Sequence, residues 1–245
     1  IGLPQDKLSI ILADKGGSSS ACSKRNLYVV LVSTGSFNPP TYMHLRCFEL
    51  ARDALNSRGF CVIGGYMSPV NDSYKKEGLI SAAHRISMCD LACRSSDLIM
   101  VDTWEASQKN WQRTLSVLLR VRSCLSNGEE AVSNDMLKVM LVCGSDLLES
   151  LSVPGFWDRD QVRIICRDFG LVCIGRDGQD VEKIIAEDDI LNEYKDNIVI
   201  VDNLVPNHIS STRLRYCISK GLSVKYLTPD EVIDYIHRNK LYMAV

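Results

Sequence analysis

Two short segments near opposite ends of the chain carry residue types suited to binding phosphate. Residues 35–44 read G-S-F-N-P-P-T-Y-M-H and follow an apolar run at 27–32. Such a turn exposes backbone N–H groups, and the start of a helix adds positive potential, so both favour an anion. Residues 209–215, I-S-S-T-R-L-R, offer hydroxyls, N–H groups and two arginines in a similar setting. Together the segments predict a site for the phosphates of a nucleotide.

The histidine of the first segment is the candidate for contact with the phosphates. Gly35 permits close backbone approach, and Thr41 can cap the helix whose first turn holds His44. Taken alone, this segment also fits a tight turn with a packed histidine. Residues 209–215 alone also fit a capped surface helix with solvated arginines. The occurrence of both in one chain favours the phosphate site.

Composition excludes several classes of protein. The net charge of −2 gives no global basic field, so we expect no nucleic-acid partner. No apolar run approaches the roughly 20 residues of a membrane span, so we expect no membrane partner. The ten cysteines lie mostly in apolar runs and form no C-x-x-C pair, which indicates free thiols in a reducing compartment and no zinc site.

Strand and helix signals alternate from residue 27 onward. Continuous apolar runs predict strands at 27–33, 60–67, 98–101, 137–143, 171–174 and 198–201, with one further apolar run at 162–166. Helical spacing predicts helices near 43–55, 81–95, 111–125, 181–186, 211–219 and 229–238, with a short one opening at 144–146. This alternation predicts an α/β fold, a Rossmann-like doubly wound parallel sheet with helices on both faces.

The chain is divided here into two parts. Residues 1–26 are expected to be a flexible arm, and residues 27–245 one α/β domain whose small helical C-terminal part begins near 205. Ligands of such sheets bind at the carboxyl ends of the strands. We therefore expect one rim to carry the loops that begin at Gly35, Ser68, Asp102, Gly144 and Asn203.

The motifs resemble a known family. T-x-x-H after G-S-F-N-P, combined with I-S-S-T-R-x-R, resembles the nucleotidyltransferase superfamily. Four blocks narrow the match: S-P-V-N-D-S-Y-K-K-E-G-L (68–79), V-D-T-W-E (101–105), C-G-S-D-L-L-E-S (143–150) and P-G-F-W (154–157). From about residue 27 to 242 the chain is similar to the eukaryotic nicotinamide mononucleotide adenylyltransferases.

This resemblance implies the reaction. Members join ATP to nicotinamide mononucleotide, and we expect nicotinate mononucleotide to be accepted as well, giving NAD or deamido-NAD and pyrophosphate. The mononucleotide phosphate is already an anionic nucleophile, so the protein has to align two anions and neutralise charge for in-line attack. Mg²⁺, or another divalent cation carried with ATP, would be held by phosphates and water, and we expect no metal site made by the protein.

The resemblance also implies a role for each matching residue. We expect three catalytic residues: His44 to stabilise the transition state, Lys76 to reach the phosphates and Arg215 to bind the β- and γ-phosphates of ATP. The ATP contacts that the resemblance implies are Gly35, His44, Gly144, Asp146, Asn207, Ser210, Ser211, Thr212, Arg213 and Arg215. The mononucleotide contacts that it implies are Ser36, Phe37, Tyr74, Lys76, Trp111, Thr114, Phe156, Trp157 and Arg176. Simpler roles stay open, since tryptophans also fit a core, Lys76 a solvated loop and Asp146 a helix cap.

Other functions and properties stay open at this point. A pantetheine-phosphate adenylyltransferase or a cytidylyltransferase has the same fold without needing Trp111 and Trp157 as a ring pocket. A non-catalytic, chaperone-like relative is the other alternative, against which the intact His44, Lys76 and Arg215 argue. We expect an intracellular protein, cytoplasmic or nuclear or both, although loop 126–135 lacks the basic insertion of nuclear relatives. The family often forms homo-oligomers, so the resemblance implies a homo-oligomer as a partner state. It identifies no interface residue in this chain.

Overall fold

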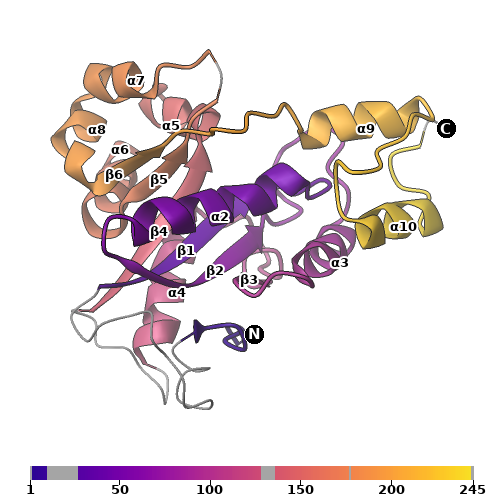
Figure 1. The fold of residues 1–245 in the computed structure, drawn as a ribbon, viewed down its shortest axis with the longest axis horizontal. Helices are drawn as coiled ribbons and strands as arrows, with labels where there is room; N and C mark the ends of the chain where they lie inside the picture. The colour runs from indigo at the N-terminus through magenta and orange to yellow at the C-terminus, as the bar shows by residue number, and fades with distance from the viewer. Residues whose placement is uncertain (1, 10–26, 128–135, 177, 244–245) are drawn as a thin grey trace.

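Six parallel strands form a single sheet at the centre of the molecule (Figure 1). The computed structural model describes residues 2–9, 27–127, 136–176 and 178–243. The strand order is β3-β2-β1-β4-β5-β6. The strands are β1 (Tyr28–Gly35), β2 (Cys61–Pro69), β3 (Ile99–Val101), β4 (Leu137–Gly144), β5 (Leu171–Ile174) and β6 (Ile198–Val201). This order reverses between β1 and β4, as in the dinucleotide-binding α/β sheets, and confirms the predicted fold class.

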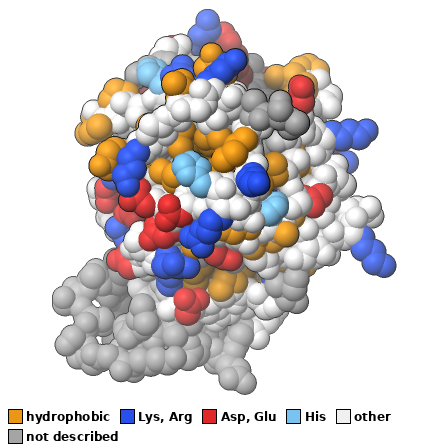
Figure 2. Space-filling model, turned by 90° about the vertical axis from the view of Figure 1, so that its right-hand side faces the viewer, with side chains coloured by type: hydrophobic (Ala, Val, Ile, Leu, Met, Phe, Trp, Pro, Cys, Tyr) orange, Lys and Arg blue, Asp and Glu red, His pale blue; other side chains and the backbone are white. Residues whose placement is uncertain are grey.

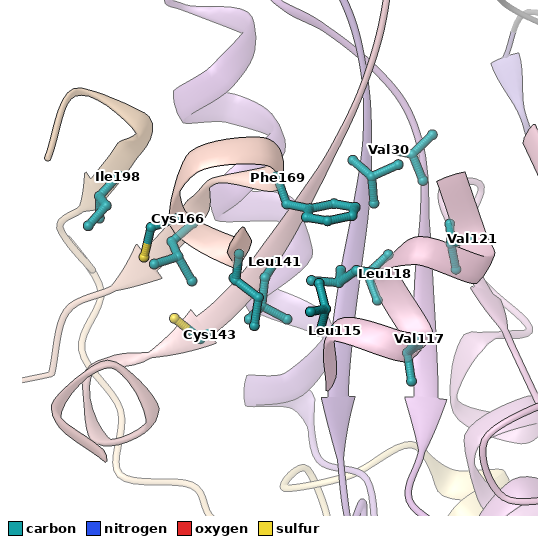
Figure 3. Packing of buried hydrophobic residues seen from close by; sticks show 14 of the residues in the cluster. Val30, Leu115, Val117, Leu118, Val121, Leu141, Cys143, Cys166, Phe169 and Ile198 are labelled. Carbon is teal, nitrogen blue, oxygen red and sulfur yellow. The ribbon is translucent and has the colours of Figure 1, made fainter. Parts of the chain in front are cut away.

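Helices cover both faces of the sheet. One face is packed by α2 (Tyr42–Asn56) and α3 (Ala82–Cys93). The other face is packed by α4 (Thr114–Ser126), α5 (Ser145–Ser152), α6 (Arg159–Ile164), a π-helical turn η1 (Ile165–Phe169), α7 (Val181–Glu187) and α8 (Asp189–Glu193). Figure 3 shows the second core, where Phe169 lies among Val30, Leu118 and Leu141. Burial on both faces explains why the strands are continuously apolar rather than alternating.

The C-terminal part packs on α3. A short 3₁₀ turn, η2 (Lys195–Asn197), leads into β6. After β6 the chain forms α9 (Ser211–Ser219) and α10 (Asp230–Arg238). Figure 1 shows α9 and α10 beyond the α3 side of the sheet. A third apolar cluster joins these three helices through Leu214, Val232 and Ile236. The α9 bounds match the predicted helix, and its start is capped by the Ser210 hydroxyl, which accepts a hydrogen bond from the N–H of Arg213.

One sequence expectation about an element is wrong, and one apolar run is assigned by the structure. The run 162–166 forms the end of α6 and the start of η1, and the Asp158 side chain caps the start of α6 by accepting the N–H of Asp160. Trp111 precedes α4 instead of opening it, and its backbone N–H donates to Ser73 Oγ at 2.7 Å. Most of the predicted arm (10–26) and of the predicted acidic loop (128–135) lies outside the described residues. Across the described helices, none is long and apolar enough to cross a membrane.

Residues 2–9, within the predicted arm, pack against the sheet. Leu8 is buried in the core. It crosses directly over Gly64, where a Cβ would come within 2.5 Å of Leu8 Cδ2. Lys7 Nζ donates to the carbonyl of Ile99 at 2.9 Å, at the start of the edge strand β3. This segment therefore adds apolar and polar contacts at the β2–β3 side of the sheet.

We expect Leu8→Ala to lower the free energy of unfolding by about 2 kcal/mol, at the low end for a buried leucine because a terminal segment can shift to close the space. Urea unfolding followed by circular dichroism measures this change. The matched control is Ser9→Ala, since Ser9 is exposed and should stay within about 0.5 kcal/mol of the parent. Equal stabilities of the two variants would show that the segment does not support the sheet.

Candidate active site

A cavity of about 590 Å³ opens at the carboxyl ends of the strands. It brings together most of the predicted site: Gly35, Ser36, Phe37, His44, Tyr74, Lys76, Trp111, Thr114, Gly144, Asp146, Trp157, Arg176, Ser210, Ser211 and Thr212. An adjoining cavity of about 170 Å³ is lined by Arg176, Asn207, Ser210 and Arg213 among others. Figure 2 views the molecule from the side of α9 and α10, where basic, acidic and histidine side chains gather around apolar ones.

Two predicted site residues lie apart from these cavities. Phe156 is 75% exposed and lines neither of them. Arg215 lines neither, and its guanidinium donates to the carbonyl of Asn38 at 2.8 Å. Its charge still acts on the site, because it helps to lower the pKa of Lys76. A substrate contact of either residue stays a prediction.

The turn after β1 is shaped by its own aromatic ring. Phe37 has a φ of 42° and a buried side chain that lies against Gly35. A Cβ at Gly35 would approach Phe37 Cζ to 3.3 Å, so the buried ring would have to shift by a few tenths of an ångström to admit one. The Phe37 ring meets His44 edge-on, with ring centroids 5.2 Å apart. Phe37 therefore packs against the His44 ring and also lines the cavity.

The carbonyl groups of this turn are bound by distant side chains. Four donors reach them: Arg85 to Ser36 (3.1 Å), Arg215 to Asn38 (2.8 Å), Ser211 to Pro39 (2.7 Å) and Thr228 to Pro40 (2.8 Å). Arg85 is fully buried and also donates to the carbonyls of Val70 and Ile80. Arg85 is not identified as a site residue from the sequence. Its position was a usable signal, because it lies three residues from Ala82 and Met88 on the buried face of α3.

His44 is held as a neutral donor. The N–H of Thr41 donates to His44 Nδ1 at 2.9 Å, so the network assigns the ring proton to Nε2. Burial, followed by the charges of Arg176 and Lys76, lowers the pKa of His44 to about 4. Near neutral pH the imidazole is uncharged, and its Nε2–H can donate to an anion in the cavity without giving up the proton.

The cations of the cavity lie close together. Lys76 Nζ donates to Ser36 Oγ at 3.1 Å. Burial and then the charge of Arg215 lower the pKa of Lys76. Arg176 pairs instead with Asp146, the carboxylate expected at the ribose. Cations that depress one another's pKa or that of a histidine favour an anion between them, so these residues are suited to phosphate.

Two tryptophans flank the cavity. Trp111 is 44% exposed, and its ring centroid lies 6.4 Å from that of Tyr74. Trp157 is half-buried, with its indole N–H donating to Ser150 Oγ at 3.0 Å. Trp104 differs, because the Arg120 guanidinium covers its ring at 5.1 Å. The first two therefore have surface available to a flat ring.

Comparisons with known proteins agree with this geometry. The cytidylyltransferase-like family model matches residues 32–216. A nicotinamide/nicotinic acid mononucleotide adenylyltransferase of Oryza sativa subsp. japonica is 61% identical, covering 98% of this chain and 93% of that protein. The protein of the same name in Arabidopsis thaliana is 60% identical, covering 99% of this chain and 98% of that protein. The chain belongs to the nicotinamide/nicotinic acid mononucleotide adenylyltransferase family. The resemblance inferred from the motifs is thereby confirmed.

More distant relatives agree. The mononucleotide adenylyltransferase 1 of Bos taurus is 40% identical, over 88% of this chain and 89% of that protein. The solved structure of the Plasmodium falciparum nicotinic acid mononucleotide adenylyltransferase, complexed with NaAD, matches with a TM-score of 0.65, covering 88% of this chain and 97% of that one. At 19% identity this structural match supports the fold alone.

We expect His44 to stay neutral down to about pH 5, because its pKa is lowered to about 4 from an ordinary 6.5. Its ring carbon shifts, followed by NMR in the free protein, should change with a midpoint near pH 4. The chain has only four histidines, so comparison with a His44→Gln spectrum assigns the signal. A midpoint near 6.5 would contradict the burial and the neighbouring cations described here.

Proposed function

We propose that this chain transfers the adenylyl group of ATP to nicotinamide mononucleotide or nicotinate mononucleotide in the larger cavity. An oxygen of the mononucleotide phosphate forms a bond to the α-phosphorus of ATP as the bond to the β-phosphate bridging oxygen breaks. Pyrophosphate leaves, and NAD or its nicotinate counterpart is the product. The observation that carries this proposal is a neutral His44 donor next to Lys76 and Arg176 in the cavity, in a chain 61% identical to a named adenylyltransferase.

The arrangement supports a division of the site into two ends. Gly144 ends β4, and Ser210–Thr212 lie at the start of α9. These positions support the assignment of both to ATP. Trp111 and Thr114 lie on the opposite side, after β3, which supports their assignment to the mononucleotide. We assign the phosphates to the space between these ends, where His44 and Lys76 line the cavity.

The residues then act by alignment and charge. We assign His44 Nε2–H to an oxygen of the transferred phosphoryl group, and Lys76 and Arg215 to the negative charge of the phosphates. No general base is required, because the attacking phosphate is already ionised. Holding two anions in line accounts for about 7–11 kcal/mol of such a barrier, and one aimed donor for about 3–4 kcal/mol.

We infer that a divalent cation, Mg²⁺ in the ordinary case, enters as part of the ATP complex. Phosphate oxygens and water suit Mg²⁺, which keeps several waters in protein sites. Within the described ranges, no three His, Cys, Asp or Glu side chains are grouped to hold a metal. An intracellular location, cytoplasmic or nuclear, is supported by eight cysteines that are free in the part of the chain that the structure describes. Cys61 is the exception to the expected free thiols, because it is disulfide-bonded. A homo-oligomer stays a prediction without assigned residues.

The proposal is tested by incubating the protein with ATP, Mg²⁺ and either mononucleotide, with the dinucleotide measured by chromatography. We expect a dinucleotide from both. Phosphopantetheine and cytidine triphosphate with a phosphorylated alcohol serve as alternative substrates. Product from those alone would favour another transferase of this fold, and no product from any would favour the chaperone-like alternative.

We expect His44→Ala to lower kcat by at least about 100-fold, the effect of removing one transition-state donor. The control is His237→Ala, since His237 is an exposed residue of α10 outside the cavities. Thermal unfolding of both variants separates chemistry from folding, because His44 also accepts the N–H of Thr41. Activity near that of the parent would show that the imidazole is not the donor.

We expect Trp157→Ala to raise the KM of the mononucleotide roughly 10- to 100-fold, from the loss of about 1–3 kcal/mol of stacking, and to leave the KM of ATP nearly unchanged. Trp157→Phe keeps an aromatic face but loses the bond to Ser150, so it should lie close to the parent. Steady-state kinetics with each substrate varied in turn gives both constants. Equal increases for ATP and the mononucleotide would refute the ring-stacking assignment.

A further inference from the structure

The larger cavity contains a buried acid that the proposed chemistry does not use. Glu105 follows β3, lines the cavity, and is only 2% exposed. One carboxyl oxygen accepts a hydrogen bond from Ser68 Oγ at 3.0 Å. Among the described residues, no other group bonds to this carboxyl. Its second oxygen is therefore available to whatever occupies that part of the cavity.

Glu105 lies at the mononucleotide end. Its loop is tied to the loop after β2, because Asn71 Nδ2 donates to the carbonyls of Ala106 at 3.2 Å and Gln108 at 2.6 Å. Trp111 follows in the same connection between β3 and α4 and is joined to the same loop, because its backbone N–H donates to Ser73 Oγ and that hydroxyl donates to Asn71 Oδ1. Gly144, which we assign to ATP, follows β4, and β1 separates β4 from β2 in the sheet. A ring placed against Trp111 is therefore on the side of the cavity that carries Glu105.

The charges around Glu105 are already paired. Asp102, the nearest acid, is bonded to Arg120 at 2.6 Å. The Arg85 guanidinium is bonded to Asp72 and to backbone carbonyls. Burial, with a further contribution from Asp102, raises the pKa of Glu105 to about 8, against the opposing effects of Ser68 and Arg85. Near neutral pH this side chain is a carboxylic acid, with one O–H donor and one C=O acceptor.

We propose that Glu105 reads the substituent of the pyridine ring and lets one site accept both mononucleotides. The O–H of Glu105 donates to the carboxylate of nicotinate mononucleotide, and its oxygen accepts an N–H from the amide of nicotinamide mononucleotide. This inference rests on the proposed function. It follows that ionised Glu105 repels the nicotinate carboxylate while it still accepts from the amide.

The sign of the pH effect follows. Below the pKa of Glu105 both substrates find a partner, so the ratio of kcat/KM for the nicotinamide form to that for the nicotinate form is constant. Above that pKa the ratio rises, by up to about tenfold for each pH unit, since the nicotinate form then requires a rarer protonated state. The substrate phosphate is common to both forms, so its own titration cancels in this ratio.

The experiment measures that ratio from about pH 6.5 to about 9.5 in the parent and in Glu105→Gln, whose amide has a donor and an acceptor but does not titrate. We expect the parent ratio to rise across about pH 8. In Glu105→Gln it should stay flat, with both substrates still converted. A parent ratio that is flat, or one that rises equally in Glu105→Gln, overturns the proposal. So does an equal loss with both substrates at every pH, which would indicate a ribose contact or a structural role.

Ser68→Ala is the second variant, because it leaves the carboxyl in place and removes the bond that lowers its pKa. We expect the inflection of the ratio to move to higher pH. An inflection that stays in place or moves to lower pH contradicts the assignment to Glu105. Failure of the proposed function is distinct, since neither mononucleotide would then give a dinucleotide at any pH.

Discussion

The carbonyl groups of the turn between β1 and α2 are the constraint on which the site depends. Buried carbonyls need donors, and here the donors come from α3, α9 and the segment before α10. The most distant of these bonds joins Pro40 and Thr228, 188 residues apart. Docking of the C-terminal part therefore shapes the turn. Held in this conformation, the turn positions Ser36, Phe37 and His44 at the cavity.

Charge within the cavity is arranged for anions that arrive from outside. Lys76 lacks an acidic partner among the hydrogen bonds and ion pairs of the described residues, while Arg176 is neutralised in part by Asp146. The two acidic groups at the site are thus either paired or, like Glu105, protonated through burial. A neutral His44 adds a donor without further positive charge. The result is a site that attracts phosphate and places no free carboxylate at its mononucleotide end.

Much of the fold could be predicted because buried parallel strands leave continuous apolar runs, as in β1 and β2. The run 162–166 does not distinguish a strand from a helix, because a short buried helix gives the same apolar pattern. Apolar spacing predicts a helix that includes Trp111, but α4 begins at Thr114. The backbone N–H of Trp111 donates instead to Ser73 Oγ, in another loop. Phe156 matches a motif and is exposed, so its contact with the mononucleotide stays a prediction. The position of Trp111 could not be read from local spacing, because the residue that binds its backbone lies 38 positions away.

The sequence by itself determined the alternation of elements, the two phosphate-type segments and the family, because these are patterns of residue type and spacing. Only the tertiary structure decided the strand order, the role of buried Arg85 and the contact of residues 2–9 with the sheet. It also decided which nitrogen of His44 holds the proton and that Glu105 holds one near neutral pH. Protonation depends on desolvation and on neighbouring charges, and folding brings both from elsewhere in the chain.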